Sequence, residues 1–228
     1  MGRLVGDYTL KNTAGQPVKL ASYRGKPLLV SFIYTGCFQI CPTTTRNLKR
    51  AVEAAQRTLG PESFNVVSIG FNLPADTPDA LHAFAREQGI NLPNWQFLSP
   101  DPVALNALSQ DLGFSYVPTP RGFDHVIQVS VLDRDGRVYR QVYGDDFPLP
   151  QLVGPLKELI TGSAPAGESL TGFLERVRIL CTVYDPASGA YRVKYSVFFE
   201  LFGGLLGLSL FAWYFVHELR RTRAARGT

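Results

Sequence analysis

Apolar residues in the first two-thirds of the chain follow two patterns. Short, nearly continuous apolar runs are bounded by glycine, proline or polar residues, whereas longer segments carry apolar residues at intervals of three and four. Continuous runs are typical of buried strands, and the longer intervals are typical of amphipathic helices. The runs predict strands at residues 28–34, 64–71, 95–98, 126–132 and 138–143. The periodic segments predict helices at residues 42–59, 78–88, 101–112 and 149–160.

Turn and cap residues support the boundaries of these predicted elements. Thr77 followed by Pro78 is typical of a helix N-terminus, because threonine caps the first turn and proline suits the first helical position. Ser99 or Asp101 can cap the next helix in the same way. The order strand–helix–strand–helix, followed by a hairpin turning at residues 135–136 and a last helix, predicts an α/β sandwich with a mixed central sheet.

A different pattern begins near residue 195. Residues 197–216 are apolar apart from Glu200, Ser209 and the glycines, and a membrane-spanning helix needs about 20 such residues. We therefore expect a C-terminal transmembrane helix at residues 195–217, followed by a basic tail at residues 218–228. Gly203 and Gly207 form the G-x-x-x-G spacing of paired membrane helices, so a homodimer through these glycines is one hypothesis.

The charged residues are unevenly placed. Four arginines against one glutamate in residues 217–228 carry three of the four net positive charges, so the body of the chain is close to neutral. A neutral body argues against nucleic-acid binding. The arginines after the apolar segment favour a cytoplasmic C-terminus, which would place the preceding domain in the periplasm at the inner membrane. No signal peptide is visible after Met1, so either the native N-terminus was trimmed or misassigned, or the body is cytoplasmic and tail-anchored.

Two cysteines stand between the first long apolar run and the helix that follows it. Cys37 and Cys41 form C-x-x-x-C-P with Pro42, and a helix that began at or before Cys37 would place both sulfurs on one face of its first turn. Thiols at a helix N-terminus have a lowered pKa. Such a pair is either a half-site for copper(I) or zinc, or a redox pair that exchanges disulfides.

The rest of the chain offers few further ligands for a metal. His82 lies within a predicted helix, His217 flanks the apolar segment, and His125 lies in a loop before a predicted strand. Met1 is the only methionine, which excludes a methionine-rich copper site, and paired C-x-x-C zinc ligands are absent. Cys181, the third cysteine, is interpreted as a buried structural residue, with an accessory metal ligand as the alternative.

Three separate elements resemble the Sco/SenC family of copper chaperones, within the thioredoxin-like superfamily. They are Y-T-x-C-x-x-x-C-P between a strand and a helix at residues 28–59, P-A-D-T-P at residues 74–78, and Asp124-His125 before a strand that leads into a hairpin. The resemblance covers residues 7–162. Phe38 and Gln39 depart from it, since family members commonly have proline and aspartate there, and the family's usual membrane anchor is N-terminal.

The resemblance implies a thioredoxin-like sandwich that binds copper, as Cu(I) or Cu(II), through Cys37, Cys41 and His125, with Asp124 orienting the imidazole. It also implies delivery of copper to the binuclear copper site of a respiratory cytochrome oxidase subunit, which is not an enzymatic activity. The redox interpretation stays open as a thiol–disulfide reductase acting on cysteines of that subunit or of another exported protein. A third hypothesis is an interaction subunit whose two cysteines form a structural disulfide.

These interpretations divide the chain into four parts. Residues 1–162 form the predicted thioredoxin-like copper-binding domain, and residues 163–194 form a linker and juxtamembrane module that contains Cys181. Within this module, residues 182–194 predict two strand pieces around a turn at residues 185–189. Residues 195–217 form the predicted transmembrane helix, and residues 218–228 form the predicted cytoplasmic tail.

Overall fold

The computed structural model describes residues 2–38, 40–120 and 122–162. Beyond them it describes residues 179, 182–185, 188, 190–193, 203–204, 206–211 and 213–215. The chain divides into two compact units, Met1–Ser169 and Leu170–Thr228.

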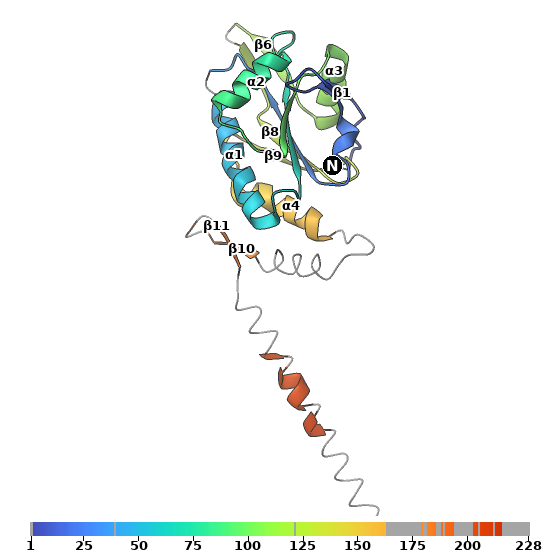
Figure 1. Cartoon of the computed structure of the whole chain (residues 1–228), viewed down its shortest axis with the longest axis vertical. Coiled ribbons are helices and arrows are strands. Elements are labelled where there is room, and N and C mark those ends of the chain that lie inside the picture. Colours follow the sequence, from blue (N-terminus) through green and yellow to red (C-terminus); the bar gives the residue numbers. More distant parts are fainter. Residues whose placement is uncertain are drawn as a thin grey trace, which may run out of the picture. The chain divides into compact units, whose positions relative to one another are not determined.

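A mixed sheet lies at the centre of the first unit (Figure 1). Its five strands have the order β5-β4-β3-β8-β9. The strands are β3 (Leu28–Ile33), β4 (Asn65–Gly70), β5 (Trp95–Leu98), β8 (Gln128–Leu132) and β9 (Val138–Tyr143). β3, β4 and β5 are parallel, whereas β8 and β9 run antiparallel to their neighbours. Every residue of β3 and β8 is buried, which explains why β3 is an almost continuous apolar run. The predicted mixed sheet is confirmed.

The helices of the first unit are α1 (Ile40–Leu59), α2 (Pro78–Glu87), α3 (Pro102–Leu112) and α4 (Leu149–Gly162). α1 packs against α4, which also contacts β8 and β9, and α2 contacts β5. The buried residues of α1, among them Leu48, Val52 and Ala55, recur at helical intervals, so one stripe of the helix faces the core. Thr77 caps α2 as predicted, and its side chain accepts a hydrogen bond from the backbone N–H of Ala80.

Two short antiparallel hairpins complete the described part of the first unit. β1 (Thr9–Lys11) pairs with β2 (Pro17–Lys19), which leads into the 3-10 helix η1 (Leu20–Tyr23). β6 (Tyr116–Thr119) pairs with β7 (Gly122–His125).

The β6–β7 hairpin corrects the prediction of a loop before residue 126. Pro118 and Pro120 favoured a loop, because proline cannot donate a backbone hydrogen bond. In a two-stranded ribbon, however, both strands are edges, where the missing N–H of a proline is tolerated. His125 therefore ends a strand and lies opposite Tyr116 on the neighbouring strand.

The second unit contains β10 (Thr182–Asp185) and β11 (Ala190–Val193), an antiparallel pair that confirms the two predicted strand pieces. Residues 203–204, 206–211 and 213–215 are helical, and their apolar side chains are exposed. Among the described residues, no helix combines the length and the apolar character that crossing a membrane requires. The predicted transmembrane helix lies partly outside the described residues, and the predicted linker, Cys181, His217 and the basic tail lie beyond them.

Candidate functional site

The two predicted cysteine ligands lie side by side where β3 passes into α1. The Cys37 backbone N–H donates to the Tyr34 carbonyl oxygen at 3.2 Å, and the Cys41 N–H donates to the Cys37 sulfur, also at 3.2 Å. α1 begins at Ile40, after Cys37, so the two cysteines do not share a helical turn. The Cys37 sulfur instead acts as a capping acceptor for the first turn, which keeps it beside Cys41. Both cysteines are reduced, with exposed fractions of 9% and 1%.

Burial dominates the electrostatics of Cys41. Removal from water raises the pKa of its thiol well above the ordinary value, and nearby charge on Cys37 and Asp76 raises it further. A hydrogen bond from the Tyr34 backbone lowers it. The lowered pKa expected at a helix N-terminus is therefore wrong for Cys41, because the loss of hydration on burial is the largest influence on its thiol. Burial therefore favours the protonated form of the Cys41 thiol, and Cys37 is the more accessible sulfur.

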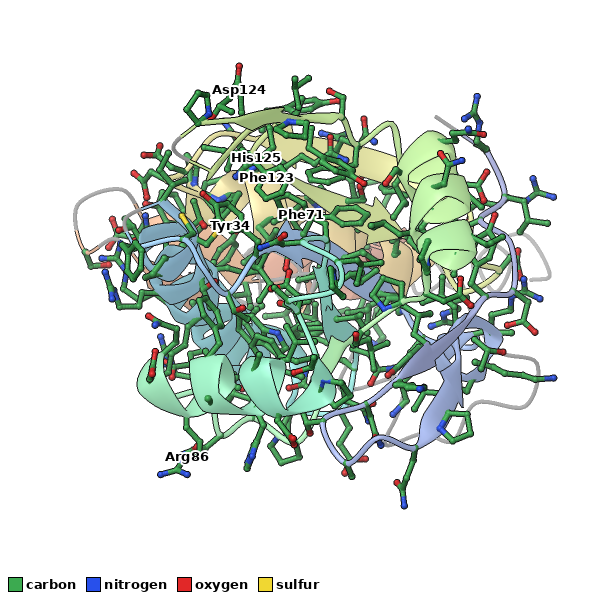
Figure 2. All side chains as sticks on the ribbon, turned by 90° about the horizontal axis from the view of Figure 1, so that it is seen from above. Tyr34, Phe71, Arg86, Phe123, Asp124 and His125 are labelled. Atoms are coloured by element: carbon green, nitrogen blue, oxygen red, sulfur yellow. The ribbon has the colours of Figure 1, made fainter. Side chains whose placement is uncertain are left out.

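The predicted third ligand, His125, lies with its ring in an aromatic cluster (Figure 2). Its ring centroid is 5.2 Å from that of Phe71 and 6.1 Å from those of Tyr34 and Phe114. Its Nδ1 atom is 3.2 Å from the Val126 carbonyl oxygen. In the tautomer that carries its proton on Nδ1, this atom donates to the carbonyl and Nε2 has the lone pair with which it can bind a metal.

Tyr34 joins the cysteine turn to the hairpin that carries His125. Its hydroxyl hydrogen-bonds to the Cys37 side chain and accepts a hydrogen bond from the Phe123 backbone N–H. Burial, followed by the bond to Cys37, raises the pKa of Tyr34 to about 12. The phenol therefore keeps its proton, and the hydroxyl donates a hydrogen bond to the Cys37 sulfur. The Tyr34 ring also packs edge-on against Phe123 and Phe71, at centroid distances of 5.2 and 5.3 Å.

A small cavity lies between His125 and the first turns of α1. His125, Thr44 and Thr45 all line it, and its volume is about 20 Å³. A cavity of this volume holds roughly one water molecule. Because Thr44 and Thr45 follow Cys41 by about one turn of α1, His125 faces the start of the helix that carries Cys41.

The three predicted copper ligands are near one another but are not assembled into a metal site. In the part of the chain that the structure describes, no three His, Cys, Asp or Glu residues are grouped so that they could hold a metal ion. Cys37 and Cys41 adjoin, whereas the imidazole of His125 remains within the aromatic cluster. Binding through all three side chains therefore requires a rearrangement that brings the His125 imidazole together with the two sulfurs.

Asp124 and His82 point elsewhere. Asp124 is exposed and lies at the outer edge of the molecule in Figure 2, because successive residues of a strand point to opposite faces. Its predicted role in orienting His125 stays a prediction. His82 is exposed on α2, as its position within a predicted helix suggested.

Asp76 was not among the predicted site residues, although it supports the cysteine turn. Its carboxylate is 1% exposed and accepts hydrogen bonds from the Thr35 N–H at 2.8 Å, the Thr35 hydroxyl at 2.7 Å and the Asn72 N–H at 2.8 Å. Burial raises the pKa of Asp76, although these donors act to lower it. The P-A-D-T-P turn contained the residue, but nothing in the sequence indicated that Thr35 would be its partner.

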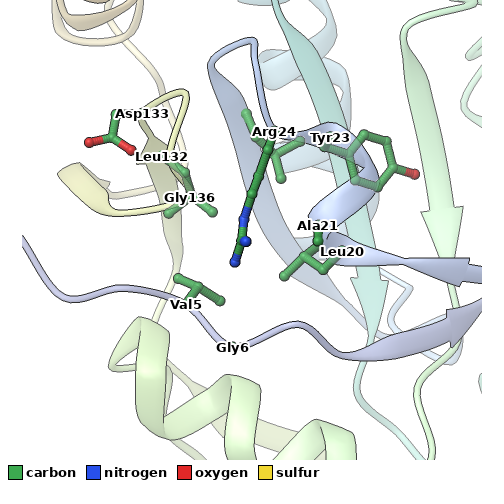
Figure 3. Close-up of a pocket in the computed structure, with 10 residues that line it drawn as sticks. Val5, Gly6, Leu20, Ala21, Tyr23, Arg24, Leu132, Asp133 and Gly136 are labelled. Carbon is green, nitrogen blue, oxygen red and sulfur yellow. The ribbon is translucent and has the colours of Figure 1, made fainter.

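A second cavity lies at the opposite end of β3 from the cysteines (Figure 3). It is lined by residues near the start of β3 and the end of β8, including Leu28, Arg24 and Asp133. Its volume is about 10 Å³, which admits at most roughly one water molecule. This cavity is therefore too small to be a ligand site.

The sheet order, the helices and the cysteine pair before α1 define a thioredoxin-like α/β protein. The SCO1/SenC family model matches residues 1–161. The chain belongs to the SCO1/SenC family, a family linked to cytochrome c oxidase assembly and to copper binding.

The chain is similar to a curated relative and to two solved structures, among others. The SCO1 protein homolog of Bacillus subtilis (strain 168) is 28% identical over 169 residues, which is 69% of this chain and 83% of the homolog. ScoI of Bradyrhizobium japonicum, solved with copper bound, is 24% identical with a TM-score of 0.57 and covers 68% of this chain and 99% of its own. BsSco, in which a disulfide switch was identified, is 24% identical with a TM-score of 0.62 and covers 72% of this chain and 96% of its own.

Proposed function

We propose that this chain is a copper metallochaperone that takes up copper through Cys37, Cys41 and His125. It delivers the ion to the binuclear copper site of a respiratory cytochrome oxidase subunit. The observation that carries the proposal is that Tyr34 touches all three groups. Its hydroxyl bonds to the Cys37 side chain, its backbone bonds to Cys41, and its ring packs near the ring of His125. Contact with one common residue therefore supports the assignment of the three side chains to one site.

The chemistry of these side chains suits copper. Soft thiolates prefer Cu(I), and imidazole combined with thiolate also accommodates Cu(II). A site with only three protein ligands leaves room for a ligand of the acceptor protein, so the ion can leave by ligand exchange. Copper is thus the cargo of this protein, and its uptake releases the proton that burial keeps on the Cys41 thiol.

The structural similarity to ScoI of Bradyrhizobium japonicum, which was solved with copper bound, supports copper as the cargo. The structural similarity to BsSco, a member of a family of cytochrome c oxidase assembly proteins, supports a role in oxidase assembly. The copper-accepting oxidase subunit is the proposed partner.

A second candidate function is reduction of a disulfide in the oxidase subunit or in another exported protein. It is favoured by two adjacent reduced cysteines, of which Cys37 is the more exposed. The Cys37 thiolate would attack the acceptor disulfide to form a mixed disulfide, and Cys41 would then resolve it. Two thiols of this chain lose two electrons and two protons, and the acceptor disulfide gains them as two thiols.

The location of the protein is also a proposal. We infer that residues 195–217 anchor the chain in the inner membrane by a single span, with residues 1–162 in the periplasm and residues 218–228 in the cytoplasm. The apolar side chains of the described helical residues 206–211 and 213–215 are more than half exposed, which is the surface that contact with lipid requires. Pairing of two chains through Gly203 and Gly207 remains a hypothesis of the same kind.

The ligand set is tested by replacing His125 with alanine. Reduced full-length protein in detergent, kept free of oxygen, is titrated with Cu(I) against a coloured chelator. We expect His125→Ala to weaken copper binding by at least the roughly 10- to 100-fold that loss of an outer-shell partner costs, because a direct ligand is lost. Spectra of the Cu(II) complex are recorded in parallel, and the wild-type protein should show a strong thiolate-to-copper charge-transfer band.

His82→Ala is the matched control, because it removes an exposed imidazole from α2. It should bind copper as the wild type does. Disulfide exchange with a model substrate should survive in both variants, since both retain Cys37 and Cys41. Equal copper affinity of His125→Ala and the wild type would contradict the proposed ligand set, and no copper uptake by the reduced wild type would contradict the chaperone function.

A further inference from the structure

We propose that Tyr34 is a positioning residue whose hydroxyl holds the Cys37 sulfur against the β6–β7 hairpin and makes a Cys37–Cys41 disulfide easier to reduce. The inference rests on the proposed function, because only reduced sulfurs can receive copper. It adds a regulatory group to that site, one that binds no metal itself.

The environment of the Tyr34 hydroxyl leaves it little freedom. The side chain is 8% exposed, and its hydroxyl donates to Cys37 while it accepts from the Phe123 N–H. Gly122 permits this close approach, since a Cβ atom at that position would lie 2.7 Å from the Tyr34 oxygen. The hydroxyl is therefore confined between the cysteine turn and the first residues of β7.

This bond should favour the reduced state of the cysteine pair. A thiol or thiolate sulfur accepts a hydrogen bond better than a disulfide sulfur does, and charge on the sulfur strengthens the bond further. When a Cys37–Cys41 disulfide is reduced, it takes up two electrons and two protons and the S–S bond breaks. The bond from Tyr34 therefore stabilises the product of this reaction more than the reactant, which raises the reduction potential of the pair.

The same bond restrains the hairpin that carries His125. The Phe123 N–H is bonded to the Tyr34 oxygen, and Phe123 precedes His125 by two residues on the same strand. Removing the hydroxyl frees this end of β7 from the cysteine turn. The ring of a phenylalanine at position 34 would still fill the space between Phe71 and Phe123, so the fold should be kept.

The test measures the equilibrium constant for reduction of the Cys37–Cys41 disulfide. The full-length protein is equilibrated with mixtures of the dithiol and disulfide forms of dithiothreitol. The dithiol supplies the two electrons and two protons, and the alkylated peptide that contains Cys37 and Cys41 is quantified by mass spectrometry, so that Cys181 does not contribute. We expect Tyr34→Phe to lower the equilibrium constant for reduction about tenfold, or roughly 30 mV. Tyr116→Phe, which removes a hydroxyl from the same aromatic cluster, should leave it unchanged.

Gly122→Ala provides a second variant that displaces the hydroxyl without removing it. Its added Cβ collides with the Tyr34 oxygen, so it should shift the equilibrium in the same direction. In a Tyr34→Phe background there is no oxygen to displace, and the further effect of Gly122→Ala should be small. This non-additivity separates the hydroxyl bond from the backbone strain of alanine at φ +123°, which is present in both backgrounds.

A Tyr34→Phe protein with the wild-type equilibrium constant would overturn the inference, as would a wild-type protein that forms no Cys37–Cys41 disulfide in this buffer. These results are independent of copper. If the wild type binds no copper but Tyr34→Phe still lowers the equilibrium constant for reduction, the chaperone function is overturned and the role of Tyr34 stands. The thiolate-to-copper band gives a further readout, since loss of a hydrogen bond to the Cys37 sulfur should shift it to lower energy.

Discussion

At the scale of single residues, Asp76 links two loops that are distant in the sequence. Its carboxylate accepts hydrogen bonds from the N–H and hydroxyl of Thr35 and from the N–H of Asn72. Gly70 leaves space for the Asp76 side chain, since a Cβ atom at position 70 would lie 2.6 Å from the Asp76 Cβ. Thr35 stands two residues before Cys37. The conformation of the cysteine turn therefore depends on a carboxylate about forty residues away.

We predict that Asp76→Asn is least stable relative to the wild type at low pH. The asparagine NH2 would face the Asn72 N–H, and an unsatisfied buried group costs roughly 1–3 kcal/mol. Burial raises the pKa of Asp76 above 3.8, so the native wild type binds this proton more tightly than the unfolded chain does. The unfolding free energy of the wild type therefore falls as pH rises from about 3.8 toward the native pKa, and the variant lacks this contribution. Urea unfolding across this pH range measures the difference, which should shrink with rising pH; a constant difference would contradict the prediction.

At the scale of elements, α3 shows how local sequence sets a helix boundary. The sequence allowed either Ser99 or Asp101 as the cap, and in the structure the Asp101 carboxylate accepts a hydrogen bond from the Ala104 N–H at 2.7 Å. Pro102 follows at the first helical position, where its missing N–H is not needed. Gly113 ends the helix with φ 64°, in the left-handed conformation that glycine adopts readily.

Asp101→Ala should lower the unfolding free energy by about 1 kcal/mol, because the Ala104 N–H loses its partner and the first turn loses a negative charge. Asp101→Asn keeps a capping oxygen and should lose only a small part of this stability. Thermal unfolding of the three proteins gives the comparison. Copper titration should give the same affinity for all three proteins, since α3 carries none of the proposed ligands. A fall in affinity would contradict the independence of helix capping and copper binding.

At the scale of the whole molecule, the chain combines the compact unit Met1–Ser169 with the unit Leu170–Thr228. The first unit buries most of its large apolar side chains in the sheet and helices, whereas Leu208 and Leu210 of the second are 70% and 58% exposed. Continuous exposed apolar surface on a helix is costly in water and favourable in lipid. The distribution of exposed side chains is therefore the basis of the proposed anchor.

We predict that the full-length protein stays with the membrane fraction after an alkaline carbonate wash. A double change of Leu208 and Leu210 to arginine should release it, because each arginine at the centre of a membrane helix costs about 2.5–3.5 kcal/mol. Val103→Arg is the control, since Val103 is an apolar side chain on α3 that is 79% exposed. Release of the wild type by the wash, or retention of the double variant, would contradict the anchor.

The central elements of the first unit could be predicted because their signals are local. The strands at residues 95–98 and 138–143 were predicted with the bounds that the structure gives, and the helix predicted at 42–59 begins two residues earlier, at Ile40. The β6–β7 hairpin was missed, because the prolines in it are compatible with a strand only when that strand lies at an edge. Whether a strand is an edge depends on its neighbours in space.

By itself, the sequence determined the order of strands and helices and the pair of cysteines before α1, because periodicity and spacing are properties of residues close together in the chain. Only the tertiary structure decided that Tyr34 touches both cysteines and packs near His125, and that Asp76 supports Thr35. It also decided that burial raises the pKa of Cys41 where a helix N-terminus alone would lower it. These features arise from burial and from contacts between distant segments, which no local pattern encodes.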